Sequence, residues 1–328
     1  MRDLSPSASR ALLTLFPLGR RQRLSILIYH RVVKERDWMR PGEPTQAEFA
    51  WQMQLLQRHF TVLPLSRAVD MLRRNCLPPR AACVTFDDGY ADNAIVALPV
   101  LQQYGIAATV FVAAGYLNGG RMWNDTVIEF LRQYSGDELD LSRAGLPAYP
   151  AESATLRRRA AYDIIRRCKY LERGQREEVA DCIAGGTATL PDNLMLTTEQ
   201  LLTLHRQGVE IGGHTFSHPI LSRLHPEQAQ DEIVRGKTEL EGILDDPLRV
   251  FAYPNGRPGM DYNQEHVALV KEAGFEAAVT TSWGVASPRS DFFQMPRFTP
   301  WDNSSIRFLL RMALNSRHVA KASGEQSC

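Results

Sequence analysis

The chain has 328 residues, of which 44% are hydrophobic and 23% are charged, so it can bury a sizeable core and is not expected to be disordered. Its 38 Lys and Arg residues balance 37 Asp and Glu residues, and a formal charge of +1 offers no basic field that would favour a nucleic-acid partner. No apolar run approaches the length of a membrane-spanning helix. The short run at 11–18 is not followed by a cleavage site, so we expect a cytoplasmic protein without stable membrane insertion.

Both ends of the chain are expected to be tails. Residues 1–23 precede the first expected strand. Their basic residues Arg20, Arg21 and Arg23 fit either contact with an anionic membrane surface or a solvated tail, of which we favour the second. Residues 315–328 follow the last expected helix. Five cysteines, odd in number and without a C-x-x-C pair, argue against a disulfide framework and a thiolate zinc site. They are Cys76, Cys83, Cys168, Cys182 and Cys328.

Short apolar runs alternate with helical patterns along the chain, which is typical of a parallel β/α sheet or barrel. Seven such runs are one fewer than an ordinary eight-stranded barrel contains. The sequence therefore predicts an α/β fold, a distorted (β/α)7 barrel, in a single catalytic domain over residues 24–314. The expected strands are 24–30, 81–87, 107–113, 209–214, 250–253, 277–280 and 294–298.

Several of the intervening helices have readable starts. Thr45 and Glu48 have the spacing of a capping box, ahead of an apolar stripe that begins at Phe49. Ser66 is expected to cap a second helix, which runs to Asn75. Further helices are expected over 92–104, 199–207, 226–244, 264–273 and 303–314.

Residues 116–198 interrupt this alternation between the third and fourth strands, with aromatic residues at Trp123, Phe130 and Tyr134 and basic helical sequence around 157–169. We expect a helical insertion there. Loops after the carboxyl ends of barrel strands border the active site, so the insertion could form a substrate-binding wall. A helical subdomain that merely covers the barrel surface is equally compatible with the sequence.

Two adjacent carboxylates and a glycine, Asp87-Asp88-Gly89, stand at the end of an expected strand. Adjacent strand residues point to opposite sides, but the chain bends where a strand ends, so both carboxylates can reach one site. By itself the triplet is weak evidence, because Asp-Asp-Gly also marks ordinary turns.

A second pair, His214 and His218, comes immediately after another apolar strand. Two neutral imidazoles and one carboxylate form a typical catalytic zinc set, which leaves coordination positions open for water and substrate. The histidine pair is only moderately specific when it stands alone. The Asp-Asp pair at another strand end makes the interpretation as a metal site much stronger.

The segments TFDDGY and HTFSH that hold these residues resemble, in wording and in order, the first two motifs of the polysaccharide deacetylases, the NodB-homology group or carbohydrate esterase family 4. The strand pattern fits this family from about residue 24 to 312. The resemblance implies that Asp87 is the general base. It also implies that Asp88, His214 and His218 bind a divalent metal, for which we expect Zn2+, although cobalt, nickel or manganese would fit the same ligands.

A third segment, FAYPNG, resembles the family's third motif, Arg-x-Pro-Tyr followed by glycine, with two departures. Ala252 stands where arginine is usual, and Asn255 stands where tyrosine is usual. In the family the arginine pairs with the catalytic base, whereas the tyrosine position gives a backbone N–H to the oxyanion, which Asn255 also has. We expect Arg297 in the last strand to replace the arginine. Its alternative role is a pair with a surface carboxylate.

The family's last motif, a Leu-x-His near the C-terminus, has no counterpart there, because His318 lies in a polar tail. Instead Ile28-Tyr29-His30 places an apolar residue two before a histidine at the end of the first strand. This resembles members with a rearranged motif order, in which the first strand supplies the general acid. His30 is therefore the expected acid, and a structural histidine is the alternative.

The resemblance implies a hydrolase that removes N-acetyl or O-acetyl groups from an amino-sugar-containing polysaccharide or glycan intermediate. An acetylated glycan is then the expected partner, and the oligomeric state stays open. Three other functions also stay open: hydrolysis of a non-carbohydrate amide at the same metal site, glycan binding without catalysis, and a metal-free structural role. Intact Asp87 and His30 argue against binding alone, since a binding protein has little need of a base and an acid.

Overall fold

The structure is a computed structural model and describes residues 22–185, 189–302 and 304–318. Arg20 and Cys328, with most of the two predicted tails, lie outside these ranges. Within them, no helix has both the length and the apolar character of a membrane span. The cysteines described as free thiols are Cys76, Cys83, Cys168 and Cys182.

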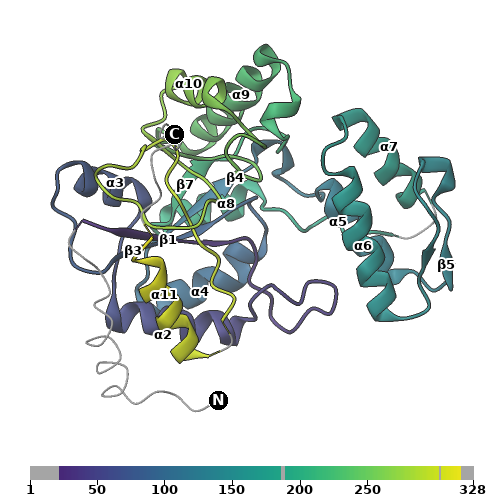
Figure 1. Cartoon of the computed structure of the whole chain (residues 1–328), viewed down its shortest axis with the longest axis horizontal. Helices are drawn as coiled ribbons and strands as arrows, with labels where there is room; N and C mark the ends of the chain where they lie inside the picture. Colours follow the sequence, from purple (N-terminus) through teal and green to yellow (C-terminus); the bar gives the residue numbers. More distant parts are fainter. Residues whose placement is uncertain (1–21, 186–188, 303, 319–328) are drawn as a thin grey trace, which may run out of the picture.

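One seven-stranded parallel sheet forms the wall of the barrel. Its strands are β1 (Leu24–Tyr29), β2 (Thr61–Val62), β3 (Ala81–Phe86), β4 (Ala108–Val112), β7 (Glu210–Gly213), β8 (Val250–Ala252) and β9 (Ala277–Val279). They follow one another in the order β1, β3, β4, β7, β8 and β9, of which Figure 1 labels the first four. The short strand β2 pairs with the first two residues of β3. The predicted α/β barrel is confirmed, and β2 is an addition that the sequence did not reveal.

The last expected strand, 294–298, does not form a regular strand. Its Met295 N–H donates to a β9 carbonyl over 3.0 Å, and its Phe298 carbonyl accepts a hydrogen bond of 3.0 Å from β1. Pro296 lies between these two contacts and has no N–H, so a continuous ladder cannot form. The prediction of a strand is wrong, but the segment still lies between β9 and β1 and closes the barrel.

Helix α2 (Gln46–His59) begins as predicted, with Thr45 as its N-cap. The N–H of Glu48 donates to Thr45 Oγ1 over 3.3 Å, and the N–H of Thr45 donates to the Glu48 carboxylate over 2.8 Å. These reciprocal bonds are the predicted capping box. They set the helix so that Phe49 faces the sheet, where its ring packs edge-on against Tyr29.

Helix α3 (Leu65–Arg73) corrects the sequence prediction, because its N-cap residue is Pro64 and not Ser66. Ser66 lies within the first turn, and its N–H donates to the carboxylate of Glu210 in β7 over 3.2 Å. A distant carboxylate therefore satisfies a first-turn N–H that a local cap would otherwise bond. Local sequence gives no sign of this contact.

The remaining barrel helices lie within a few residues of their predicted bounds. One difference is at 92–104, where a π-helical turn over Asn93–Ala97 precedes the regular helix. That helix ends at Gly105, whose φ of 60° provides a left-handed cap. The helices are α4 (Leu98–Tyr104), α8 (Thr198–Arg206), α9 (Pro226–Leu244), α10 (Gln264–Glu272) and α11 (Ser305–Asn315).

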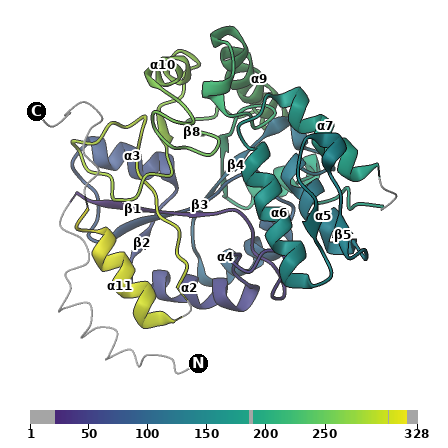
Figure 2. The same ribbon diagram turned by 45° about the vertical axis from the view of Figure 1, so that its right-hand side comes forward.

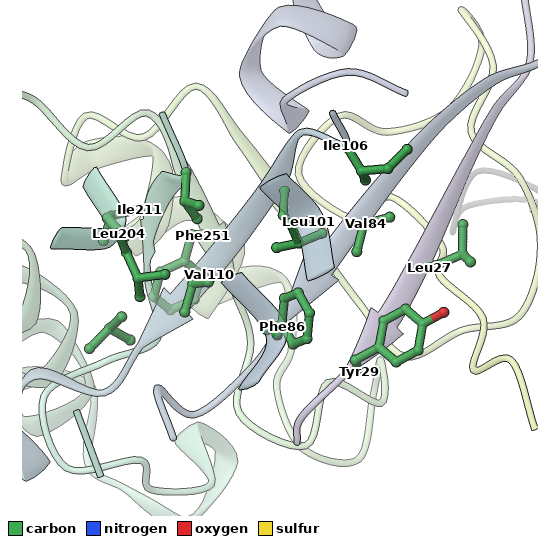
Figure 3. Packing of buried hydrophobic residues seen from close by; sticks show 14 of the residues in the cluster. Leu27, Tyr29, Val84, Phe86, Leu101, Ile106, Val110, Leu204, Ile211 and Phe251 are labelled. Carbon is green, nitrogen blue, oxygen red and sulfur yellow. The ribbon is translucent and has the colours of Figure 1, made fainter. Parts of the chain in front are cut away.

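Hydrophobic side chains cover both faces of the sheet, because successive residues of a strand point to opposite sides. Leu27, Phe86 and Val110 belong to the larger cluster, together with Leu101 of α4 and Leu204 of α8 (Figure 3). Residues of α2, α9, α10 and α11 (Ser305–Asn315) complete this cluster. Ile26 and Cys83, from the alternate positions, belong to a second cluster that includes α3. The strands are thus fixed from both sides, and their carboxyl ends are held at constant positions.

The expected insertion is helical and has a core of its own. It contains α5 (Trp123–Gln133), the strands β5 (Glu138–Leu139) and β6 (Tyr149–Pro150), α6 (Ala154–Cys168) and α7 (Arg173–Ala184). Val127, Leu131 and Ile164 lie in a hydrophobic cluster separate from those of the sheet. Figures 1 and 2 show these helices grouped beside the barrel.

Buried ion pairs join the insertion to the barrel. Arg40, in the loop before α2, pairs with both Asp125 and Glu129 of α5, the second at 2.8 Å. Asp125 also accepts a hydrogen bond of 3.2 Å from the hydroxyl of Tyr90, which follows the Asp-Asp-Gly turn. All four side chains are buried. The position of the insertion is therefore coupled directly to the end of β3.

We predict that Arg40→Ala destabilises the protein by about 3–5 kcal/mol, because it leaves two carboxylates buried without their cation. Urea unfolding measures this loss. Arg36→Ala is the matched control, since its guanidinium pairs with Glu48 at the surface and should contribute less than about 1 kcal/mol. Equal losses in the two variants would contradict a structural role for the buried network.

Candidate active site

A cavity of about 590 Å³ lies at the carboxyl ends of the strands. Parallel strands bring these ends to one edge of the barrel, so residues distant in sequence become neighbours. Every predicted site residue except Arg297 lines this cavity. They are His30 after β1, Asp87 and Asp88 after β3, His214 and His218 after β7, and Asn255 after β8.

The three predicted metal ligands meet in the cavity. Asp88 Oδ1 lies 3.4 Å from His214 Nε2 and 3.2 Å from His218 Nε2. Ligand atoms of all three residues lie within 4.8 Å of one another. A tetrahedral ion with bonds of about 2.0–2.1 Å places its ligand atoms about 3.3 Å apart, so these side chains fit one divalent ion.

Backbone contacts orient the first histidine of this group. His214 Nδ1 lies 2.7 Å from the carbonyl oxygen of Ala252 in β8. A proton on Nδ1 can donate to this carbonyl, which leaves the lone pair of Nε2 directed toward Asp88. The backbone carbonyl of Ala252 thus orients His214, although alanine replaces the arginine that is usual at this position.

The loop that carries the second histidine is tied to α9. The Glu232 carboxylate accepts hydrogen bonds from the N–H of Phe216 at 3.1 Å and from the N–H of Ser217 at 2.7 Å. Within the loop, the N–H of His218 donates to Thr215 Oγ1 over 3.1 Å. These bonds hold His218 beside His214 without a regular helix, although the four-residue spacing would also suit a helix.

Several non-glycine residues of the site have left-handed backbone conformations. The φ angles are 75° at Asp88, 64° at Thr215, 54° at His218 and 60° at Asn255. Such conformations cost about 1–3 kcal/mol each and persist where the surrounding structure enforces them. Their concentration at one cavity indicates that the local backbone is shaped for the placement of side chains.

Asp87 is held by Arg297 in a buried, two-pronged ion pair. Arg297 Nη1 and Nη2 donate to the two carboxylate oxygens of Asp87, each over 2.7 Å. The same guanidinium donates from Nε to the carbonyl of Thr280 over 3.0 Å and from Nη1 to Thr85 Oγ1 over 3.2 Å. The guanidinium therefore reaches Asp87 from the closing segment, and not from position 252.

Electrostatics favour an ionised form of Asp87 and a neutral form of His218. Burial alone would raise the pKa of Asp87, but the Arg297 guanidinium outweighs burial and lowers the pKa of this carboxyl. Burial lowers the pKa of His218 to about 4, although the nearby Asp88 acts in the opposite direction. At neutral pH the Asp87 side chain is thus a carboxylate, whereas His218 is neutral and can offer a lone pair.

His30 follows β1 and lines the cavity. Its backbone is held by Asn93, whose side-chain amide donates to the His30 carbonyl over 2.9 Å. Burial lowers the pKa of His30, but the carboxylates of Asp88, Asp87 and Glu43 together raise it above its ordinary value. The protonated imidazole is therefore favoured. Glu43 also lines the cavity and was not expected from the sequence.

Asn255 lies at a sharp turn after β8, where the next residue, Gly256, has a φ of 66°. The carbonyl of Asn255 accepts a hydrogen bond of 2.8 Å from the Thr281 hydroxyl. Among the described residues, the Asn255 N–H has no hydrogen-bond acceptor. This N–H is thus available to a ligand.

Sequence reasoning missed part of the cavity lining. Tyr90 was visible only as the end of the TFDDGY segment, and its bond to Asp125 depends on the fold. Trp123, Tyr162 and Lys169 reach the cavity from the insertion. The aromatic and basic composition of the insertion was a signal, but its orientation against the barrel was not predictable from local patterns.

Comparison with known families places this geometry in context. The family model for polysaccharide deacetylase matches residues 74–165 and 169–278, more than half of the chain. The chain belongs to the polysaccharide deacetylase family. The predicted family and enzyme class are therefore confirmed. The matched ranges of this deacetylase include the DDG and HTFSH segments, whereas His30 and Arg297 lie outside them.

Individual proteins are also similar to the chain. The chain is 23% identical over 276 residues to "Putative polysaccharide deacetylase YxkH" of Bacillus subtilis (strain 168). The aligned region covers 84% of this chain and 70% of that protein. The deacetylase PplD of Streptococcus pyogenes has a TM-score of 0.60 at 19% identity, over 90% of this chain and 99% of PplD. IcaB from Ammonifex degensii has a TM-score of 0.58 at 21% identity, over 89% and 97% of the two chains. These structures confirm the fold.

We predict a characteristic pH dependence for the stability contributed by His30 in the metal-free protein. Because the folded-state pKa of His30 is raised, its contribution is fully present below the unfolded pKa of about 6.5 and is lost as pH rises through the folded pKa. The difference in unfolding free energy between wild type and His30→Gln should therefore shrink with increasing pH. Urea unfolding across this range measures it, with the exposed His225→Gln as control. A difference that grows with pH would contradict the prediction.

Proposed function

We propose that this polysaccharide deacetylase is a divalent-metal-dependent hydrolase that removes N-acetyl groups from an amino-sugar-containing glycan. The observation that carries the proposal is the meeting of Asp88, His214 and His218 beside an Asp87 carboxylate that Arg297 holds in place. We further propose that the catalytic unit spans residues 24–314 and includes the insertion 116–198.

The proposed metal ligands are Asp88, His214 and His218, with zinc as the first choice for one carboxylate and two imidazoles. When bound, such an ion supplies Lewis acidity, which lowers the pKa of water from about 16 toward about 7 and polarises an acyl carbonyl. The ligand distances, and the contact of His214 with Ala252, support this assignment. The choice among zinc, cobalt, nickel and manganese rests on ligand chemistry alone.

Asp87 is the proposed general base. Its carboxylate accepts a proton from the attacking water, so that a new C–O bond forms at the acyl carbon. Arg297 acts as a positioning residue, because its two hydrogen bonds fix the plane of the carboxylate and keep it ionised. The buried pair has the same chemistry as the family's arginine–base pair, but its arginine is Arg297 and not a residue at position 252.

The remaining steps use Asn255 and His30. The N–H of Asn255 donates to the oxyanion, a type of contact that often contributes about 3 kcal/mol. His30, as imidazolium, gives its proton to the sugar nitrogen while the C–N bond breaks, so acetate and a free amino sugar leave. The raised pKa of His30 supports this role, because an amine is a poor leaving group until it is protonated.

The decisive experiment is acetate release from a panel of N-acetylated and O-acetylated oligosaccharides and small amides. We expect release from N-acetylated sugars that a chelator abolishes and added Zn2+ restores. Asp87→Asn should lower kcat by about 10²–10⁴, the usual contribution of general base catalysis. His225→Asn, an exposed change, is the control. Equal activity in Asp87→Asn and wild type would reject the base, and release from amides or esters alone would reject the N-acetyl glycan.

A second experiment tests Arg297. Arg297→Met should lower kcat by about 10²-fold, because the base loses its orientation and its pKa rises, and Arg297→Lys should restore part of that activity as a single cation. The pH–rate profile of Arg297→Met should show its acid limb moved to higher pH. If Arg297→Met keeps wild-type turnover and pH profile while bound metal is unchanged, Arg297 does not position the base.

A further inference from the structure

The cavity of the proposed active site continues beyond it. A second cavity of about 340 Å³ adjoins it between the insertion and the loop after β7, and both cavities are lined by Lys169 and Arg176. Arg257 lines the first of them, and Arg223 lines the second. The second cavity is therefore lined by three cations and one carboxylate, that of Glu172, although the chain as a whole has a formal charge of only +1.

Three of these cations surround one ring. Lys169 Nζ lies 5.8 Å from the centre of the Tyr170 ring, and the guanidinium carbons of Arg223 and Arg257 lie 5.2 and 5.7 Å from it. We call Lys169, Arg223 and Arg257 the cationic junction. The nearby buried carboxylate of Asp261 pairs with Arg257 at 3.1 Å and accepts a hydrogen bond from the Tyr170 hydroxyl at 3.0 Å. Three positive charges thus share one close carboxylate.

Structural roles explain the neighbouring basic residues of α6 but not the junction. Arg157 and Arg158 donate to backbone carbonyls, and Arg166 and Arg167 both pair with Asp163. By contrast, Lys169 and Arg223 form no ion pair with any carboxylate of the described part of the chain. Burial lowers the pKa of Lys169, and Arg257 lowers it further against the pull of Asp261. A half-buried cation of this kind is favoured when an anionic ligand binds beside it.

We propose that the cationic junction binds a negatively charged group on the same glycan that is deacetylated, so that the substrate is an anionic acetylated saccharide. This inference rests on the proposed function and narrows its substrate class. The shared chemistry is an oxyanion, either the carboxylate of a uronate residue or the diphosphate of a carrier-linked sugar. Lys169 and Arg223 are the specificity-determining residues, since Arg257 is already paired.

The test compares three ligands: a neutral N-acetylglucosamine tetrasaccharide, a tetrasaccharide in which N-acetylglucosamine alternates with glucuronate, and UDP-N-acetylglucosamine. Calorimetry on the metal-loaded Asp87→Asn variant gives binding constants without turnover, and wild-type kcat/KM provides a second readout. At least one anionic ligand should bind about tenfold more tightly than the neutral one. A factor of about this size is the change in binding constant expected from one charge-assisted hydrogen bond. That preference should fall between about 0.05 M and 0.5 M salt, because screening weakens exposed charges.

Lys169→Gln and Arg223→Gln should each reduce the preference for the anionic ligand by about tenfold. Arg159→Gln removes the same charge from an exposed position of α6 outside both cavities and is the matched control. If Lys169→Gln weakens binding of the glucuronate tetrasaccharide, the anionic group is a uronate. If it weakens binding of UDP-N-acetylglucosamine alone, the anionic group is the diphosphate of a carrier-linked sugar. Equal binding of all three ligands, or an equal effect of Arg159→Gln, would overturn the proposal. Absence of acetate release from every substrate would instead overturn the proposed function and leave the binding test intact.

Discussion

Closure of the barrel is the constraint on which the site depends. The segment around Met295–Phe298 bonds to β9 on one side and to β1 on the other. This places Arg297 under the end of β3, where its guanidinium meets Asp87. Without that closure the buried carboxylate would lack its counter-charge, and burial would favour its neutral form. A segment with only isolated bridges to its neighbours thus keeps the Asp87 side chain ionised.

The sequence was most informative where chemistry is local. Apolar runs located six strands, and the spacing of Thr45 and Glu48 located the start of α2. The pairs Asp87-Asp88 and His214-x3-His218 stand at strand ends, so a parallel barrel necessarily brings them to one edge. Three of these residues lie close enough to share an ion, as their types and positions had indicated.

The sequence was less informative where a contact joins distant segments. The first turn of α3 is bonded by Glu210 from β7, which no pattern near Ser66 could reveal. Segment 294–298 forms only isolated bridges because Pro296 has no N–H. The apolar pattern that predicted a strand there does not take this effect of proline into account. The position of the insertion depends on Arg40 and its two partner carboxylates in α5, which lie far from Arg40 in the sequence. The misses at α3 and at the insertion concern tertiary contacts, whereas the miss at 294–298 is a local effect of proline.

The left-handed backbone at Asp88, Thr215, His218 and Asn255 has a consequence for how this protein can change over evolutionary time. Glycine adopts such conformations without steric cost, so a substitution to glycine at these positions would raise the stability of the fold. Two of the four side chains, however, are the proposed metal ligands Asp88 and His218, and a third, Thr215, accepts the hydrogen bond from the His218 N–H. Stabilising substitutions are therefore expected elsewhere in the barrel, because glycine at Asp88 or His218 would relieve the backbone and remove a proposed metal ligand at the same time.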